Sequence, residues 1–378
     1  LTETSTREPA IICKHFKQVK FSAFDISGII ARICAKPCGQ TTRGQNNKHQ
    51  PTRLCIVSIQ TIRSLIANDM LAVDDVIRRN LYSDVALVRQ IGEYIISAGG
   101  KRLRPMLVLL SAGAFGYRGS AQHELAAVVE FIHTATLLHD DVVDESDLRR
   151  GRKTANAMFG NAASVLVGDF LYSRAFQMMV RVGSMRVQEV LAEATNVIAE
   201  GEVLQLMNIH NADIDEADYM RVIQYKTAKL FEAATRLGAI ISNATPEQEN
   251  AIAEYGMLLG TAFQIVDDVL DYTGDAAAIG KNLGDDLAEG KPTLPLIYTM
   301  QRGNTEQAAL ARKVIEQGGR DDFDAIVAAV RDCGALEAAM TTAENIKQQA
   351  IRCLDAIPPS QFRNTLLELS VFAVDRKS

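Results

Sequence analysis

Three aspartates, Asp140, Asp141 and Asp144, follow an almost wholly apolar stretch of the sequence. On a helix, residues four apart lie on one face, so Asp140 and Asp144 point the same way. Such carboxylates repel each other unless a hard divalent cation lies between them, and Mg2+ is usually held by one or two carboxylates plus substrate phosphate oxygens. Arg149 and Arg150 follow, and guanidinium groups suit bidentate contacts with phosphate. The segment therefore predicts a magnesium–diphosphate site; the alternative is a solvated acidic helix end before a basic loop.

A second acidic motif repeats this pattern further along the chain. Apolar residues again precede two adjacent aspartates, two apolar residues and a third aspartate, here Asp267, Asp268 and Asp271. Two such clusters on separate apolar helices suggest opposite walls of one cavity, each holding metal ions. A diphosphate bridged between them is neutralised from both sides, which stabilises it as a leaving group.

A turn rich in glycine and cations, Gly99–Pro105, lies between two predicted helices and contains Lys101, Arg102 and Arg104. Glycines let the backbone approach a ligand closely, and the cations supply charge for a phosphate group. The turn predicts a second diphosphate cradle, and the alternative is an ordinary basic loop. Because both aspartate motifs are present in the same chain, we favour the cradle.

Together these motifs resemble the trans-isoprenyl diphosphate synthases, especially the bacterial octaprenyl members of that family. The resemblance covers residues 67–378 and is carried by four stretches in the expected order: Gly99–Pro105, Asp140–Gly151, Lys226–Thr227 and Gln264–Asp271. It implies a Mg2+-dependent head-to-tail prenyltransferase that adds isopentenyl diphosphate to an allylic diphosphate, farnesyl or similar. The implied product is a long-chain all-trans polyprenyl diphosphate, octaprenyl diphosphate, for the side chain of a quinone.

The resemblance also implies roles for individual residues. Six aspartates would hold Mg2+: Asp140, Asp141, Asp144, Asp267, Asp268 and Asp271. Isopentenyl diphosphate would contact Lys101, Arg104, His133 and Arg150. The allylic diphosphate would contact Arg149, Lys226, Thr227, Gln264 and Lys281, with Lys291 as a further candidate. The residues expected to carry catalysis are Asp140, Asp144, Arg149, Lys226, Thr227, Gln264 and Asp267.

Product length is expected to depend on the residues beneath the first aspartates. Thr136 and Ala135, four and five residues before Asp140, are both small. Short-chain members of the family place an aromatic side chain there as a floor. The resemblance therefore implies an open tunnel that continues past Ile132, and a shorter, geranylgeranyl product is the alternative.

Two other functions fit part of the pattern. A class I terpene cyclase also uses an aspartate-rich helix and Mg2+, but usually lacks the Gly99–Pro105 turn and carries a different second metal motif. A non-catalytic subunit of a heteromeric prenyl synthase has usually lost metal ligands, whereas all six motif aspartates are present here. Both functions therefore rank below an active synthase.

The predicted fold is all-α. From about residue 67, apolar residues recur at helical spacing, and no alternating strand pattern of useful length follows. We expect a single bundle of about ten or more mostly antiparallel helices around a central cavity. The net charge of −6 gives no reason to expect nucleic-acid binding. We expect a cytoplasmic protein that, by resemblance, forms a homodimer and makes a transient peripheral membrane contact when the product leaves.

Residues 1–66 differ in character from the rest of the chain. Lys and Arg outnumber Asp and Glu there, no long helical period is visible, and no family motif falls within them. We predict a disordered or non-native basic extension, with an organellar transit peptide or a functional basic arm as alternatives. The polyprenyl synthase domain would then comprise residues 67–378.

Overall fold

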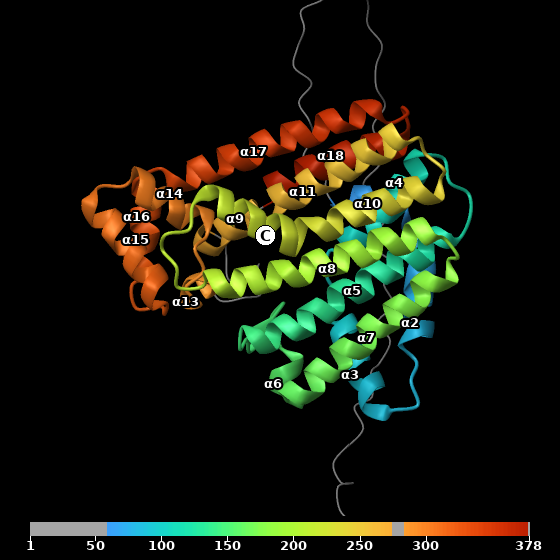
Figure 1. The fold of residues 1–378 in the computed structure, drawn as a ribbon, viewed down its shortest axis with the longest axis horizontal. Helices are drawn as coiled ribbons and strands as arrows, with labels where there is room; N and C mark the ends of the chain where they lie inside the picture. The colour runs from blue at the N-terminus through green and yellow to red at the C-terminus, as the bar shows by residue number, and fades with distance from the viewer. Residues whose placement is uncertain (1–58, 274–282, 377–378) are drawn as a thin grey trace, which may run out of the picture. The chain divides into compact units, whose positions relative to one another are not determined.

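A computed structural model of the protein describes residues 59–273 and 283–376. Apart from a short hairpin, the secondary structure in these ranges is helical, which confirms the predicted all-α fold (Figure 1). The longer helices are α2 (Ala67–Leu81), α3 (Ala86–Ser97), α4 (Leu103–Ala114), α5 (Ala121–Val143), α7 (Asn161–Arg181), α8 (Met185–Asn208), α10 (Lys229–Ile241), α11 (Pro246–Thr273), α15 (Thr305–Gln317), α17 (Ala335–Cys353) and α18 (Gln361–Asp375). The shorter elements are α1 (Ile59–Leu65), α6 (Ala155–Phe159), α9 (Glu216–Ile223), a π-helix (Gln224–Ala228), α13 (Asp285–Ala288), α14 (Leu294–Arg302), α16 (Phe323–Asp332) and a 3₁₀ turn (Leu354–Ala356).

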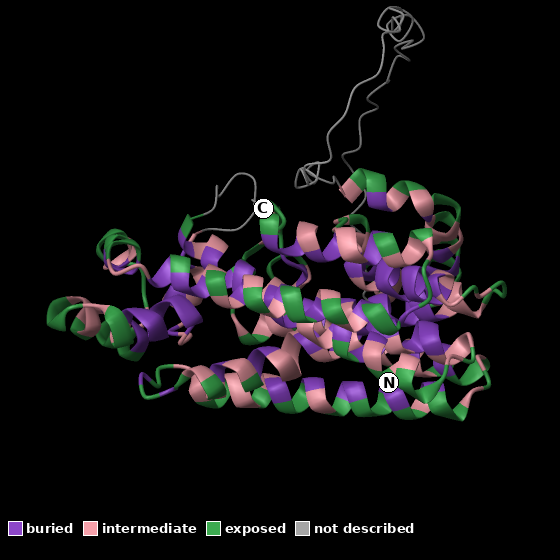
Figure 2. Ribbon diagram, turned by 90° about the horizontal axis from the view of Figure 1, so that it is seen from above, coloured by how far each residue is buried: buried purple, intermediate pink, exposed green. Residues whose placement is uncertain are grey.

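Helix α5 is the central element of the bundle and packs against α2, α4, α7 and α10. Every residue from Leu125 to Ile132 is buried, because a helix that is apolar on all sides needs neighbours on all sides. Figure 2 shows the buried residues along the inner faces of the helices, with exposed residues outside. The C-terminal end of α5, which carries the first aspartates, is therefore held by a packed core.

Helix α11 connects the two hydrophobic cores of the bundle. Tyr255 and Leu259 belong to the core built around α4, α5 and α7, whereas Ile265 and Val266 belong to the core with α14–α17. The Tyr255 hydroxyl donates a hydrogen bond of 2.6 Å to the carbonyl of Leu366, which ties α11 to α18. The second aspartates follow directly on this anchored helix. None of the helices described is long and apolar enough to cross a membrane.

The helical domain begins earlier than the predicted boundary at residue 67. Helix α1 precedes that boundary, and Ile62 and Ile66 are each only 1% exposed in the main core. The Arg63 guanidinium donates hydrogen bonds to the carbonyls of Gly100 (3.2 Å) and Lys101 (2.9 Å), so α1 supports the basic turn. A helix of two turns is too short to show a clear period in the sequence, which explains the error. The prediction for residues 1–58 lies outside the described residues.

The expectation of no strands also needs a small correction. Leu148–Arg149 (β1) and Arg152–Lys153 (β2) pair antiparallel directly after the first acidic motif. Arg150 and Gly151 form the turn, both with positive φ. The hairpin was not visible as an alternating pattern because each strand has only two residues. It matters for function because it carries Arg149 and Arg150.

Candidate active site

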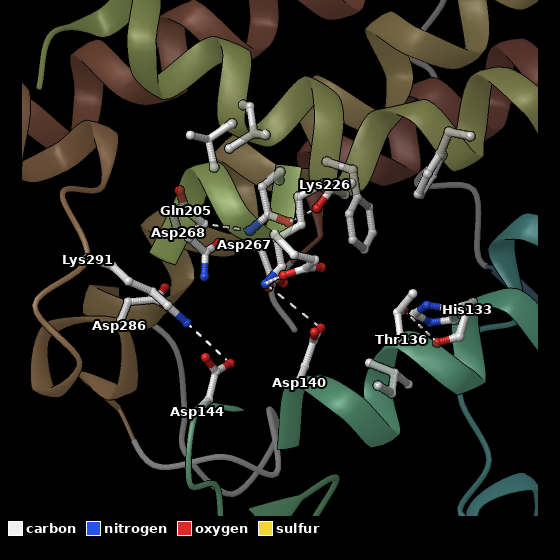
Figure 3. Close-up of a pocket in the computed structure, with 18 of the residues that line it drawn as sticks. His133, Thr136, Asp140, Asp144, Gln205, Lys226, Asp267, Asp268, Asp286 and Lys291 are labelled. Carbon is white, nitrogen blue, oxygen red and sulfur yellow. Dashed lines mark hydrogen bonds and ion pairs between the residues drawn. The ribbon is translucent and has the colours of Figure 1, made fainter. Parts of the chain in front are cut away.

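Most of the predicted site residues surround one cavity of about 720 Å3. Its walls come from α5, α8, α9, the π-helix, α10, α11 and the segment after α13, with the basic turn at one side. Figure 3 shows the aspartates of α5 and α11 on different walls of this space. The predicted residues that line it are Lys101, Arg102, Arg104, His133, Thr136, Asp140, Asp144, Arg149, Arg150, Lys226, Thr227, Gln264, Asp267, Asp268 and Lys291.

The first acidic motif contributes two of its three aspartates to the cavity. Asp140 lies in the last turn of α5, and Asp144 ends the helix, its N–H donating to the Asp140 carbonyl at 2.8 Å. Asp141 does not line the cavity, is fully buried and accepts a hydrogen bond of 2.7 Å from Arg149 Nε. In this structure Asp141 therefore holds Arg149 at the cavity wall, and its predicted role as a metal ligand stays a prediction.

The second acidic motif also contributes two of its three aspartates to the cavity, but at different positions of the motif. Asp267 and Asp268 line the cavity, whereas Asp271 lies outside the lining and accepts a hydrogen bond from the Gly284 N–H at 3.1 Å. Asp268 is only 4% exposed, and its two oxygens accept hydrogen bonds from Tyr219 Oη (2.6 Å) and Gln264 Nε2 (2.8 Å). Burial raises the pKa of the Asp268 carboxyl well above its usual range.

Two lysines bridge to the first aspartates. Lys226 Nζ lies 3.8 Å from Asp140 Oδ2 and 2.5 Å from Glu202 Oε2. Lys291 Nζ lies 3.4 Å from Asp144 Oδ2 (Figure 3). Both ammonium groups therefore occupy positions from which they can also reach a bound anion. Burial raises the pKa of Glu202 to about 7 against the opposing effect of Lys226, as expected where carboxylates are crowded.

The carboxylates of this acidic end fit a divalent cation. Asp140 and Asp144 lie on one wall, and Asp267, Asp268 and Asp286 on the other (Figure 3). All the donors are carboxylate oxygens, which suit hard cations. Within the described residues, no group of three or more His, Cys, Asp or Glu could hold a metal ion by itself. A divalent cation bound here would take further oxygens from a phosphate group, as Mg2+ usually does.

The basic residues gather at the other end of the cavity. Burial lowers the pKa of Arg104 to about 10 and, with Arg376 nearby, that of Lys101 to about 8. Burial and four surrounding arginines lower the pKa of His133 well below its usual range. Arg104 Nε is buried and has no hydrogen-bond partner in the described part of the chain. This end of the cavity therefore holds more positive charge and donor capacity than the protein itself satisfies, which favours an anion.

Glycine is required at position 100 in the basic turn. Gly100 has a φ of 140°, and a Cβ there would lie 2.8 Å from the guanidinium carbon of Arg150. Arg150 donates a hydrogen bond to the Gly99 carbonyl, so the hairpin and the basic turn are tied together. Gly100 thus allows the close approach of Arg150 to the turn, and the approach of a ligand to these glycines stays a prediction.

The predicted helix through Lys226 and Thr227 is interrupted in the structure. A π-helix replaces the α-helix at Gln224–Ala228, and such insertions are frequent at functional sites. Thr227 Oγ1 donates to Gln264 Oε1 at 3.0 Å, and Gln264 Nε2 in turn donates to Asp268. The chain of hydrogen bonds fixes the orientation of the Gln264 amide beside the cavity.

The three predicted tunnel residues are not equivalent. Thr136 lines the cavity, whereas Ala135 and Ile132 are fully buried in the main core and do not line it. Lys281, the remaining predicted contact of the allylic diphosphate, lies outside the described residues.

Several residues of the lining were missed by sequence reasoning. They are Glu130, Glu202, Gln205, Tyr219, Phe231, Phe263, Asp286 and Arg376. Glu202 and Asp286 belong to segments without a recognisable motif, although the pair Asp285–Asp286 was a usable signal. Arg376 comes from the end of α18, pairs with Asp267 at 3.1 Å and donates to the Phe263 carbonyl at 2.8 Å. No local pattern in the sequence indicates that Arg376 lies beside Asp267 and the cavity.

Comparison with known proteins agrees with this geometry. The sequence model of the polyprenyl synthetase family matches residues 85–331. The chain belongs to the polyprenyl synthetase family. It is 55% identical over 321 residues to the octaprenyl diphosphate synthase of Escherichia coli, covering 85% of this chain and 99% of that protein. It is 46% identical over 319 residues to the all-trans-nonaprenyl-diphosphate synthase of Rhodobacter capsulatus, covering 84% and 98%.

Solved structures of the family share the fold. A polyprenyl synthase from Caulobacter crescentus, crystallised with calcium and isoprenyl diphosphate, superposes with a TM-score of 0.83 at 43% identity, covering 86% of this chain and 99% of that one. A decaprenyl diphosphate synthase from Rhodobacter capsulatus gives a TM-score of 0.80 at 46% identity, covering 85% and 100%. The resemblance seen in the motifs is thereby confirmed, and this polyprenyl synthetase is a prenyltransferase.

Proposed function

We propose that this polyprenyl synthetase uses Mg2+ to add isopentenyl diphosphate units head-to-tail to an allylic diphosphate and makes a long-chain all-trans product. The observation that carries the proposal is the opposite charge of the two ends of one cavity. Asp140 and Asp144 face Asp267 across the acidic end, where a metal-bound diphosphate fits. Arg104 and Lys101 stand at the basic end, where a diphosphate fits without metal.

The arrangement suits the bond changes of the reaction. The allylic C–O bond breaks, the diphosphate departs with the electron pair, and an allylic cation remains. Bound divalent cations supply positive charge to the departing diphosphate. Lys226 and Lys291 add charge from the protein at the acidic end, and Asp141 holds Arg149 at the cavity wall.

The second substrate then supplies the electrons for the new bond. Isopentenyl diphosphate, held by its diphosphate at the basic end, places its double bond towards the cation. A carbon–carbon bond forms, and the proton released afterwards passes to the departed diphosphate. The Gln264 carbonyl oxygen, oriented by Thr227 and Asp268, faces the cation as a negative dipole.

For the product we propose octaprenyl diphosphate, a precursor of a quinone side chain. The support is the 55% identity to an octaprenyl diphosphate synthase. Relatives at 46% identity are named for nine or ten isoprene units. The number of units is therefore the part of the proposal that most needs measurement.

The test is an elongation assay on the full chain. Incubation with farnesyl diphosphate, labelled isopentenyl diphosphate and Mg2+ is expected to give a single long polyprenol after dephosphorylation. Chelation of the metal should abolish incorporation, and added Mg2+ should restore it, because the acidic end cannot hold diphosphate without a counter-cation. A product of geranylgeranyl length contradicts the long-chain proposal but keeps the chemistry. No incorporation by the isolated protein contradicts the synthase and favours a non-catalytic subunit.

We also propose that the protein is a homodimer. Several large apolar side chains are exposed along α7 and α8, and exposed apolar side chains that gather in a patch often mark a protein–protein interface. They are Leu166 (67%), Val180 (59%), Met185 (68%), Val203 (57%), Leu206 (58%) and Met207 (73%). Sedimentation equilibrium is expected to give twice the monomer mass of 41.3 kDa, and a monomer at micromolar concentration would contradict this.

A further inference from the structure

A carboxylate lies within the basic end of the cavity. Glu130, on α5 one turn before His133, lines the cavity and is only 7% exposed. Its Oε1 forms an ion pair of 3.3 Å with Arg102 Nη1, and the two side chains are 9% and 14% exposed. The placement needs an explanation, because a buried negative charge beside an anion-binding site repels the anion.

Arg102 is the residue that Glu130 contacts, and its backbone is unusual. Arg102 has a φ of 53°, in the left-handed region that non-glycine residues rarely adopt, and it caps the N-terminus of α4. Its side chain makes no capping hydrogen bond and turns inward to Glu130. Conformations of this kind persist where surrounding contacts hold them. The ion pair with Glu130 is such a contact.

The position of the Arg102 backbone affects the positions of Lys101 and Arg104, which flank it in the chain. Lys101 precedes it, and Arg104 follows it in the first turn of α4. Arg104 stacks on Phe231 with 4.7 Å between the guanidinium carbon and the ring centroid, which fixes the plane of the group. A shift at the start of α4 would therefore move Lys101 and misalign Arg104 against its ring.

Glu130 also limits repulsion among the cations. Burial lowers the pKa of Arg104, the negative charge of Glu130 opposes that effect, and Arg150 adds to it. Without Glu130, the buried guanidinium groups would lack this compensation when no substrate is bound. The same carboxylate thus keeps the cations together before the diphosphate arrives.

We propose that Glu130 is a positioning residue for the diphosphate of isopentenyl diphosphate, acting through Arg102 and the start of α4. The inference rests on the proposed function of the basic end. It is specific to that end, since Glu130 makes no ion pair with the residues that face the acidic end in the described part of the chain. In this proposal, the binding gained because Lys101 and Arg104 are correctly positioned is larger than the binding lost because Glu130 repels the anion.

The test is a Glu130→Gln variant of the full chain, which removes the charge and keeps the shape. Calorimetric titration with isopentenyl diphosphate in the absence of metal is expected to show about tenfold weaker binding, the scale of one lost charge-assisted contact. In the elongation assay, KM for isopentenyl diphosphate should rise by about the same factor, while kcat and KM for farnesyl diphosphate change less than about twofold. Glu130→Asp, which keeps the charge, should restore binding to within about threefold.

Two further variants separate the possible outcomes. Glu232→Gln removes a carboxylate of similar exposure (13%) that pairs with Arg236 at 2.9 Å and does not line the cavity, so it should leave isopentenyl diphosphate binding unchanged. The second variant, Arg104→Ala, tests the basic end itself.

If Arg104→Ala binds isopentenyl diphosphate as tightly as wild type, the proposed site for isopentenyl diphosphate is wrong. If Arg104→Ala binds weakly but Glu130→Gln binds as tightly as wild type or more tightly, only the role of Glu130 is overturned. If Glu130→Gln does not fold, Glu130→Asp decides alone. Binding of isopentenyl diphosphate by Glu130→Asp that is more than about threefold weaker than wild type overturns the role of Glu130 as well.

Discussion

Replacing Asp140 by Asn is expected to lower kcat by about a hundred- to a thousandfold, the scale on which one electrostatic contact to a transition state acts. The substitution keeps the size of the side chain and removes its negative charge. Asp140 is the aspartate of α5 that lies nearest Lys226 and faces the acidic end of the cavity. Without it, the divalent cation that neutralises the departing diphosphate loses a ligand, and KM for the allylic substrate should rise as well.

The same variant gives a readout besides activity. Thermal unfolding of the wild type with Mg2+ and inorganic diphosphate should occur at higher temperature than without them, because ligands that bind only the folded state stabilise it. Asp140→Asn should lose most of this shift while its ligand-free Tm stays close to wild type. Asp169→Asn is the matched control, since Asp169 lies on α7 with its side chain 64% exposed and outside the cavity lining. An Asp140→Asn enzyme with near-normal kcat would show that Asp140 is not a metal ligand.

Replacing Thr136 by Phe is expected to shorten the product made from farnesyl diphosphate from a long polyprenyl chain to geranylgeranyl length. Thr136 lines the cavity four residues before Asp140, which places it about 6 Å along the helix from the metal end. A growing chain that passes between the helices would meet an aromatic ring there after few additions. The Thr136 hydroxyl already bonds to the His133 carbonyl at 2.9 Å, so loss of that bond alone should matter little.

Chain analysis by thin-layer or liquid chromatography measures this result. Thr136→Val, which keeps the volume, should still give long products. Ala135→Phe should lower Tm markedly, because Ala135 is fully buried and overpacking costs about 1–3 kcal/mol. A Thr136→Phe enzyme that still makes full-length product would place the path of the chain elsewhere in the bundle.

The sequence alone determined the fold class and most of the chemical groups. Apolar residues at helical spacing predicted the bundle, since each helix must bury one stripe of its surface. Asp140, Asp144 and Asp267 were recognisable because carboxylates after an apolar run need a counter-charge. Lys101 and Arg104 were recognisable because glycine and cations share one short turn.

Only the tertiary structure decided which members of each motif face the cavity. Asp141 and Asp271 look like their neighbours in sequence, but one turns to Arg149 and the other to the Gly284 N–H. Thr136 and Ala135 look alike too, yet only Thr136 lines the cavity. Adjacent residues on a helix point in different directions, so the packing of α5 and α11 settles these roles.

The structure also supplied the residues that approach from far along the chain. Arg63, Glu130 and Arg376 reach the basic turn or the cavity from α1, α5 and α18. Such contacts depend on how the helices pack in three dimensions. The periodicity of one helix, which reports neighbours three or four residues apart, does not indicate which distant residues it will contact. Local motifs in the sequence therefore identify the chemical groups of the site, whereas the packing of the helices determines how their charges are arranged.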